Sequence, residues 1–374
     1  MNILIFLIIL LILVIVHEFG HFFTAKKFGI RVDEFGFGFP PKLFGVKYGE
    51  TEYTFNLFPL GGFVKIFGEN PNEENTNGPD SERSFVNKAK WKQAIVLFAG
   101  VFANFLLAWL LFSFGFMSGL PASVSNLPDY ELEDVNLVIV SVLPKSPAEE
   151  AGLKSGDKIV FLGSLPEGEE DPVDPINPDT LKSFIVSHGD QEIQIGYLRD
   201  KIGKNTGEDI RFTKITPLKN TTDDKPSIGI AMDQIGIAKL SVFSALWEGM
   251  KLDWNMTKST AVGLYGLILD GVRGRGSFDS ITGPVGIVGV VGDAYKFGFV
   301  YLLSFTALIS VNLAIINLLP FPALDGGRLL FLLIEKIKGS RMNPKVANTL
   351  NAIGFGVLIL LMLIVTYHDV IKLF

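Results

Sequence analysis

Four stretches of the chain are apolar and long enough to cross a membrane, and they constrain the fold more than any other feature. They cover about residues 2–24, 94–116, 298–319 and 346–366. About 20 helical residues, at 1.5 Å each, cross a hydrocarbon core of about 30 Å. Of the 374 residues 48% are hydrophobic, a high share for a soluble enzyme. The sequence therefore predicts an α-helical multi-pass membrane protein.

The first apolar stretch contains the pattern H-E-x-x-H, formed by His17, Glu18 and His21. On a helix the two imidazoles lie one turn apart on the same face, about 6 Å along the axis. This spacing suits two positions of a tetrahedral zinc site, and Glu18 can take a proton from metal-bound water. Residues 1–16 carry no ionisable side chain. Ionisable groups at membrane depth are costly, so a functional role is favoured over satisfied core histidines.

The residue inventory limits what else can bind the metal. The chain has no cysteine, which excludes disulfides, thiolate catalysis and cysteine-bound zinc. Of the two other histidines, His188 is interpreted as a surface residue and His368 as an interfacial one. A third ligand is therefore expected to be an acid. Pro320 and Pro322 break the third apolar helix just before Asp325, and such irregular backbone at membrane depth is tolerated only where it lines an enclosed cavity.

The distribution of charge predicts how the helices are oriented. The short connections 25–92 and 325–345 are rich in Lys and Arg, which places them on the cytoplasmic side. Residues 118–240 carry 12 Lys and Arg against 21 Asp and Glu, and are expected outside. The first and third spans then both run inward, and His17 lies about 22 Å along the first. His17 and Asp325 are thus expected at the same depth, towards the cytoplasm.

Two further segments are expected to contact the membrane. Residues 47–67 predict a β-hairpin that turns at Pro59–Gly62 and dips into the bilayer against protein, with a free edge. A small soluble cytoplasmic hairpin is the alternative. Residues 239–276 have apolar side chains at helical spacing and predict an interfacial helix. A Gly/Pro-rich turn, Thr282–Ile287, is expected before the third span.

Residues 146–159 read S-P-A-E-E-A-G-L-K-S-G-D-K-I, and Ser227–Ile230 read S-I-G-I. The first pattern resembles the PDZ module of membrane and HtrA-type proteases, and the second resembles its carboxylate-binding loop. Together with H-E-F-G-H, F-P-L-G-G-F-V-K at residues 58–65, G-P-V at 283–285 and N-x-x-P-x-P-x-L-D-G-G from Asn317, they occur in the order found in the site-2 protease family. Nearly the whole chain resembles these intramembrane metalloproteases. Some members carry two tandem PDZ domains, whereas this chain has room for one.

The resemblance implies a zinc-dependent intramembrane endopeptidase that acts on pre-cleaved membrane proteins in regulated intramembrane proteolysis. His17, His21 and Asp325 would bind Zn²⁺, and Glu18 would act as general base and then as proton donor. Asn317 would hold the substrate backbone or the oxyanion, and the hairpin edge at Gly61 and Gly62 would hold an extended substrate. The PDZ domain would exclude substrates with bulky external domains.

The resemblance also implies partners and location. Substrates would be transmembrane proteins, for example anti-sigma-factor-like or signal-peptide-like segments, in a cell membrane and with no role for nucleic acid. The N-terminus and PDZ domain would be extracytoplasmic, and nothing requires more than a monomer. The expected parts are residues 1–117 (first half of the membrane core), 118–238 (PDZ domain), 239–296 (interfacial helix and Gly/Pro loop) and 297–374 (second half of the core).

Three other functions remain open from the sequence. A metal transporter or channel could use His, Asp and a broken helix, but leaves Glu18 and the PDZ module unexplained. A non-catalytic PDZ scaffold leaves the buried His and acid residues without a purpose. A membrane-anchored zinc protease working in water would more naturally place H-E-x-x-H beyond the span.

Overall fold

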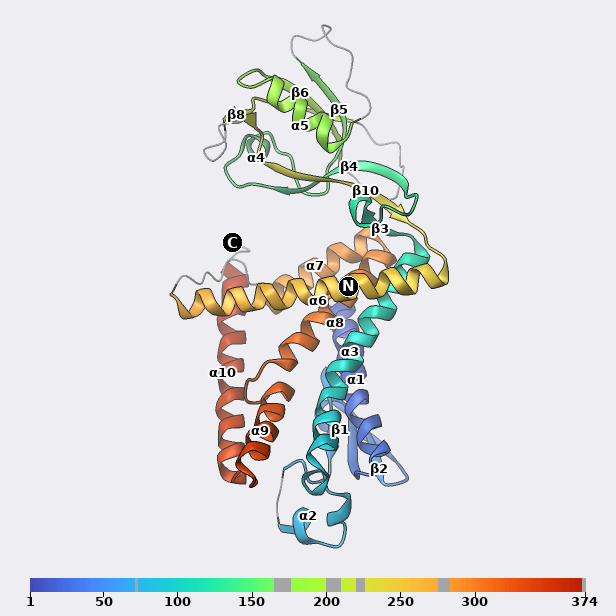
Figure 1. Cartoon of the computed structure of the whole chain (residues 1–374), viewed down its shortest axis with the longest axis vertical. Coiled ribbons are helices and arrows are strands. Elements are labelled where there is room, and N and C mark those ends of the chain that lie inside the picture. The colour runs from blue at the N-terminus through green and yellow to red at the C-terminus, as the bar shows by residue number, and fades with distance from the viewer. Residues whose placement is uncertain (71–72, 165–175, 200–209, 220–225, 275–282, 372–374) are drawn as a thin grey trace. The chain divides into compact units, whose positions relative to one another are not determined.

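A computed structural model describes residues 1–70, 73–164, 176–199, 210–219, 226–274 and 283–371 of the chain (Figure 1). The chain forms two compact units. The first comprises Met1–Gly115 together with Phe243–Phe374, and the second comprises Phe116–Val242. Each unit is described by itself.

The first unit contains the four predicted spans. Four helices in the described ranges are long and apolar enough to cross a membrane: α1 (Asn2–Lys27), α3 (Lys90–Ser118), α8 (Phe299–Leu318) and α10 (Pro344–Ile371). Each lies within a few residues of its predicted bounds. Their lipid-compatible outer faces carry exposed side chains such as Ile8, Phe102 and Leu360. The prediction of four membrane-length helices is confirmed.

Two apolar clusters hold these helices together. Ile9 and Leu13 of α1 pack with Val291 of α7 (Pro284–Phe297) and with side chains of α8. Ala108 and Phe112 of α3 pack with Ala307 and Val311 of α8, and here α6 (Val242–Val272) contributes Leu252 and Met256. Figure 1 shows α6 crossing the long axes of α3 and α10. The predicted helix over this segment is confirmed, and it is not among the candidate spans.

The predicted turn of the hairpin at Pro59–Gly62 is wrong. Strand β1 (Val32–Tyr48) pairs with β2 (Thr51–Ile66), and the tight turn between them lies at Gly49-Glu50. Phe35 pairs with both Tyr53 and Val64, so this part of β1 lies between two segments of β2. Residues 53–58 and 63–66 therefore do not pair with each other as predicted, because a strand from earlier in the chain lies between them.

The predicted Gly/Pro turn before the third span is also wrong over its described part. Residues 284–297 form helix α7, which begins at Pro284, while Thr282 lies outside the described residues. Proline suits the first turn of a helix, where its missing N–H leaves no bond unmade. Asp369 of α10 accepts hydrogen bonds from the backbone N–H groups of Gly283 (3.1 Å) and Gly286 (2.8 Å), and so caps the helix. The buried carboxylate that starts α7 comes from 86 residues further along the chain.

The connection between α8 and α9 (Asp325–Lys338) is packed without space for larger side chains. A Cβ atom added to Gly326 would lie 2.2 Å from the carbonyl oxygen of Leu318, and one added to Gly327 would lie 2.1 Å from that of Phe321. Asn351 of α10 accepts a hydrogen bond from the Ala323 backbone at 3.1 Å. The broken helix predicted at Pro320 and Pro322 is thus a fixed turn that delivers Asp325.

Short helices connect the spans on the side of the hairpin. They are α2 (Glu73–Asn77), η1 (Ser81–Arg83) and η2 (Phe85–Asn87). Phe85 packs with Ala25, Ile30 and Val96 in a third apolar cluster that joins this connection to α1 and α3.

The second unit is built on an antiparallel six-stranded sheet with strand order β3-β10-β4-β5-β6-β7. Its elements are β3 (Leu120–Ser123), η3 (Val124–Asn126), β4 (Glu133–Val142), α4 (Pro147–Glu150), β5 (Lys158–Ser164), α5 (Pro178–Ser187), β6 (Ile193–Leu198), β7 (Arg211–Ile215), β8 (Leu218–Lys219), β9 (Pro226–Ser227) and β10 (Ile230–Ala238). Ile139, Leu162, Leu181 and Ile195 are fully buried between the sheet and α5. As predicted, Ser146 caps α4 by accepting the Glu149 N–H.

Candidate metal centre

Helix α1 holds His17 and His21 one turn apart, and both side chains are buried (7% exposed). Their rings lie edge to face, with centroids 4.8 Å apart. They face α3, where Gly100 leaves the space that they fill. A Cβ atom added to Gly100 would lie 2.3 Å from His21 Nε2 and 2.9 Å from His17 Cε1. In the opposite direction, a Cβ atom on Gly20 of α1 would lie 2.3 Å from the Ala99 carbonyl oxygen. The two glycines let the helices approach closely enough for α3 to support the imidazoles.

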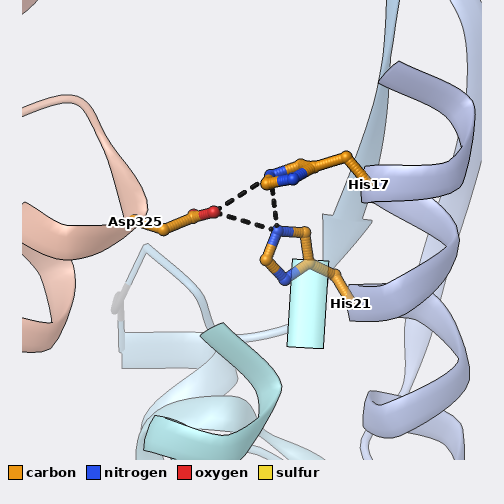
Figure 2. A group of neighbouring side chains, drawn as sticks. All are labelled: His17, His21 and Asp325. Atoms are coloured by element: carbon orange, nitrogen blue, oxygen red, sulfur yellow. Dashed lines mark hydrogen bonds and ion pairs between the residues drawn. The ribbon is translucent and has the colours of Figure 1, made fainter. Parts of the chain in front are cut away.

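Asp325, the first residue of α9, brings its carboxylate to the two imidazoles (Figure 2). Asp325 Oδ2 lies 3.0 Å from His17 Nε2 and 3.2 Å from His21 Nε2. The two Nε2 atoms are 3.2 Å from each other. These three atoms are therefore the corners of a nearly equilateral triangle. His17, His21 and Asp325 form a group of His and acid residues able to hold a metal ion in the described part of the chain.

This triangle fits a zinc ion. Bonds of about 2.0–2.1 Å at tetrahedral angles place neighbouring ligand atoms about 3.3 Å apart. The three observed separations of 3.0–3.2 Å are close to this value. His21 Nδ1 lies 2.8 Å from the Val96 carbonyl oxygen, which can only accept, so that ring carries its proton on Nδ1. The Nε2 atom then carries a lone pair and not a proton. Lone pairs and a carboxylate oxygen this close together repel one another, and a cation bound between them removes that repulsion.

Glu18 lines the same cavity, of about 310 Å³, as the three candidate ligands. Phe63, Val64 and Ile66 of β2 form part of the wall. The segment after the predicted Gly61-Gly62 pair therefore borders the candidate metal centre.

The remaining predicted site residues lie around this cavity. Asn317, near the end of α8, lines it. Gly61 and Gly62 are buried beside Val14 of α1, with a Cβ atom on either 3.8 Å from Val14 Cγ1. The structure thus places His17, Glu18, His21, Asn317 and Asp325 around one cavity, whereas Gly61 and Gly62 do not line it. Neither His188 nor His368 belongs to the candidate metal group in the described part of the chain.

Sequence reasoning missed an ion pair in the cavity wall. Arg328 of α9 pairs with Glu69, which follows β2, and both line the cavity. Arg328 lies one helical turn after Asp325, so it faces the same way as the candidate ligand. Arg328 directly follows Gly326 and Gly327, and this position next to the candidate ligand could have marked it as a site residue. Its partner Glu69 lies in a connection with no distinguishing sequence pattern.

The cavity contains a candidate metal centre beside an acid that could act as a base, and comparisons with known proteins identify the class of enzyme. The model of peptidase family M50, the site-2 protease family, matches residues 5–361. Three relatives, each named a putative zinc metalloprotease, are similar over almost their whole length. They come from Fusobacterium nucleatum (33% identical over 100% of both chains), Clostridium perfringens (33%, over 96% of this chain and 95% of the relative) and Rickettsia conorii (31%, over 99% and 98%).

The chain therefore belongs to peptidase family M50. It is a zinc-dependent membrane metalloprotease. The predicted family, enzyme class and cofactor are confirmed.

Proposed function

We propose that this metalloprotease cleaves peptide bonds in or near the transmembrane segments of membrane proteins that another protease has already shortened. His17, His21 and Asp325 hold the zinc ion, and Glu18 is the catalytic base. The observation that carries the proposal is the position of the triangle: two of its corners lie on a helix of membrane length, 15 or more residues from its apolar start.

The residues around the cavity suit peptide hydrolysis. Zinc supplies Lewis acidity, which makes water a nucleophile near neutral pH and polarises the peptide carbonyl. Glu18 takes a proton from the attacking water as the new C–O bond forms. It then gives this proton to the leaving nitrogen as the C–N bond breaks. Asn317 lies near the end of α8, before the break in the helix, and donates a hydrogen bond to the substrate carbonyl.

A transmembrane helix must be unwound before its backbone can reach the cavity. In our proposal the β2 segment at Gly61 and Gly62 holds the unwound substrate as an added strand. Two observations support this role. Phe63 and Val64 line the cavity, and Gly62 lies beside the catalytic base, since a Cβ atom on it would be 4.0 Å from Glu18 Cγ.

The second unit acts as a PDZ domain in this proposal. A cavity of about 450 Å³ lies between α5 and β10, lined by Lys182, Ile185, Ile228, Ile230 and Met232 among others. In the described residues, Ile230–Gln234 of β10 pair only with β4, because the pairing with β3 begins at Ile235. The other edge is free to add an extended peptide. We assign residues 118–238 to the PDZ domain. Residues 1–117 and 297–374 are the two parts of the membrane core, and residues 239–296, which include α6 and α7, connect the PDZ domain to the second part.

The proposed orientation places the N-terminus and the PDZ domain outside and the active site towards the cytoplasm of a cell membrane. Because the chain has no cysteine, single cysteines can test it. Glu131→Cys should react with a membrane-impermeant maleimide in intact cells, and Glu73→Cys only after lysis; both positions are exposed. The reverse pattern would overturn the orientation while leaving the metal site unaffected.

Zinc content and cleavage of a test transmembrane substrate examine the chemistry. Glu18→Gln should abolish cleavage and retain zinc, because the carboxylate acts on water and does not bind the metal. Glu248→Gln is the control, since Glu248 is a buried acid of the same unit (6% exposed) that does not line the cavity. Substantial cleavage by Glu18→Gln would remove Glu18 as the base. Cleavage of soluble peptides but of no membrane-embedded segment would overturn the substrate class.

A further inference from the structure

Asn104 of α3 lies against His17 on the side of the ring away from the proposed metal. Its amide nitrogen is 3.3 Å from His17 Nδ1, and the residue is fully buried (0% exposed). The backbone of Asn104 is also fixed, because Ser310 of α8 donates a hydrogen bond to its carbonyl oxygen at 2.8 Å. Asn104 is thus a rigidly held polar group that contacts a candidate ligand and touches neither the metal position nor the cavity.

The two histidines differ in what their outer nitrogens meet. His21 Nδ1 faces the Val96 carbonyl, which can only accept a hydrogen bond, so the proton of this ring is on Nδ1. His17 Nδ1 faces a side-chain amide, which can donate through its NH₂ group or accept through its oxygen. The proton position of His17 therefore depends on which end of the Asn104 amide faces the ring.

Only one of the two amide orientations allows His17 to bind zinc through Nε2. If the NH₂ group donates to Nδ1, a neutral His17 carries its proton on Nε2, between Asp325 and His21. If the amide oxygen faces the ring, Nδ1 carries the proton and the Nε2 lone pair is free for the metal. Asn104 Oδ1 has no hydrogen-bond partner among the described residues. A half-turn of the amide therefore replaces one hydrogen bond to His17 with another. It costs no hydrogen bond at Oδ1, because that atom has no partner among the described residues.

We propose that Asn104 is a positioning residue that holds His17 in the zinc-binding tautomer, with Oδ1 accepting the Nδ1–H proton. This inference rests on the proposed assignment of His17 and His21 as zinc ligands. Val96, Gly100 and Asn104 are spaced by one helical turn each and so lie on one face of α3. That face supports both imidazoles: Val96 orients His21, Gly100 makes room for the rings, and Asn104 orients His17.

Zinc affinity separates an accepting from a donating side chain at position 104. The full chain in detergent is titrated with Zn²⁺ against a competing chelator. Asn104→Leu removes the hydrogen bond at similar volume and should weaken zinc binding about 10–100-fold, as loss of such a partner typically does. Asn104→Asp can accept but not donate when ionised, and should bind zinc within a few-fold of wild type. Ser113→Ala is the control for loosening α3, since Ser113 is buried on the same helix and donates a hydrogen bond to the Trp109 carbonyl oxygen.

Two outcomes would overturn the inference. Unchanged affinity in Asn104→Leu would show that His17 needs no partner, and equal weakening in Leu and Asp variants would show that the amide donates. ¹⁵N NMR of the imidazoles in the zinc-loaded wild type gives an answer without any variant. We expect His17 to carry its proton on Nδ1, and a proton on Nε2 would contradict the proposal. Loss of zinc in His17→Ala with no effect of Asn104→Leu would reject this inference alone, whereas normal zinc in His17→Ala would reject the proposed ligands.

Discussion

The two units of this protein both have apolar clusters, but the membrane unit also buries polar side chains beside its candidate metal centre. The unit Phe116–Val242 has an apolar core of residues such as Ile139, Leu162 and Ile195. In the other unit the membrane-length helices expose large apolar side chains, and buried polar residues gather near the site. These include His17, His21, Asn104 and Ser310.

This difference indicates how each unit is stabilised. Removing apolar surface from water stabilises the sheet unit. Helices in lipid gain little from that effect, so close packing and polar contacts hold them together. In the membrane unit, the same glycines and hydrogen bonds that join α1 to α3 also build the metal centre. We expect substitutions there to affect stability and chemistry together, and substitutions in the sheet unit to affect stability alone.

The largest effect is expected from filling the space at Gly100. A Cβ atom there would lie 2.3 Å from His21 Nε2, so Gly100→Leu must displace the imidazoles. A misplacement of about 1 Å can cost about 100-fold in rate, and we expect at least ~100-fold loss of cleavage together with loss of bound zinc. Gly263→Leu is the control, because a Cβ atom at Gly263 has no neighbour within 4 Å. Equal zinc content in both variants would contradict the packing account.

A core substitution in the sheet unit should separate stability from chemistry. Leu162→Ala removes a fully buried side chain and should destabilise this unit by about 2–5 kcal/mol. Hydrogen exchange should show faster opening of the amides of β5, while zinc content stays unchanged. Val140→Ala, at a side chain that is 49% exposed, should change stability by less than about 0.5 kcal/mol. Loss of zinc in Leu162→Ala would show that the two units are not independent in this sense.

The smallest effect is expected at the turn between β1 and β2. Burial acts to raise the pKa of Glu50, but hydrogen bonds and charges from Lys26 and Arg83 together lower it below its ordinary value. A lowered pKa in the folded state means that this contribution is present above pH about 4.5 and is lost as the pH falls below it.

The size of this contribution is limited by solvent, because the Glu50 side chain is 29% exposed and Arg83 43%. We expect at most about 1 kcal/mol. The protection factors of the turn amides against hydrogen exchange should fall as the pH decreases from about 5 to about 3 in wild type, and much less so in Glu50→Gln. Glu82→Gln, at an exposed position, should behave as wild type. Identical pH dependence in Glu50→Gln would exclude Glu50 as the source.

How much the sequence reveals depends on whether a feature is local. The four spans were predicted within a few residues because hydropathy is a property of the segment itself. Asp325 was predicted as a ligand because the prolines before it and the glycines after it lie in the same short stretch. The hairpin turn was misplaced because residues 34–37 insert between two segments of β2, and no pattern within 47–67 encodes that insertion.

Other features were missed because their partners are distant. Helix α7 begins at a proline whose cap, Asp369, comes from the last span. The supporting face of α3, formed by Val96, Gly100 and Asn104, is not evident from the sequence. Its relation to His17 and His21 needed the structure, because 75 and 87 residues separate the bonded pairs.

Zinc content per chain in wild type and Asp325→Asn tests the central claim most directly. The account predicts one zinc per chain in wild type, and lost or strongly weakened zinc together with no cleavage in Asp325→Asn, because the substitution keeps the shape but removes the charge. Asp369→Asn is the control: Asp369 is a buried acid of the same unit that caps α7, and its substitution should leave zinc binding unchanged. Normal zinc content and normal cleavage in Asp325→Asn would contradict the three-residue site.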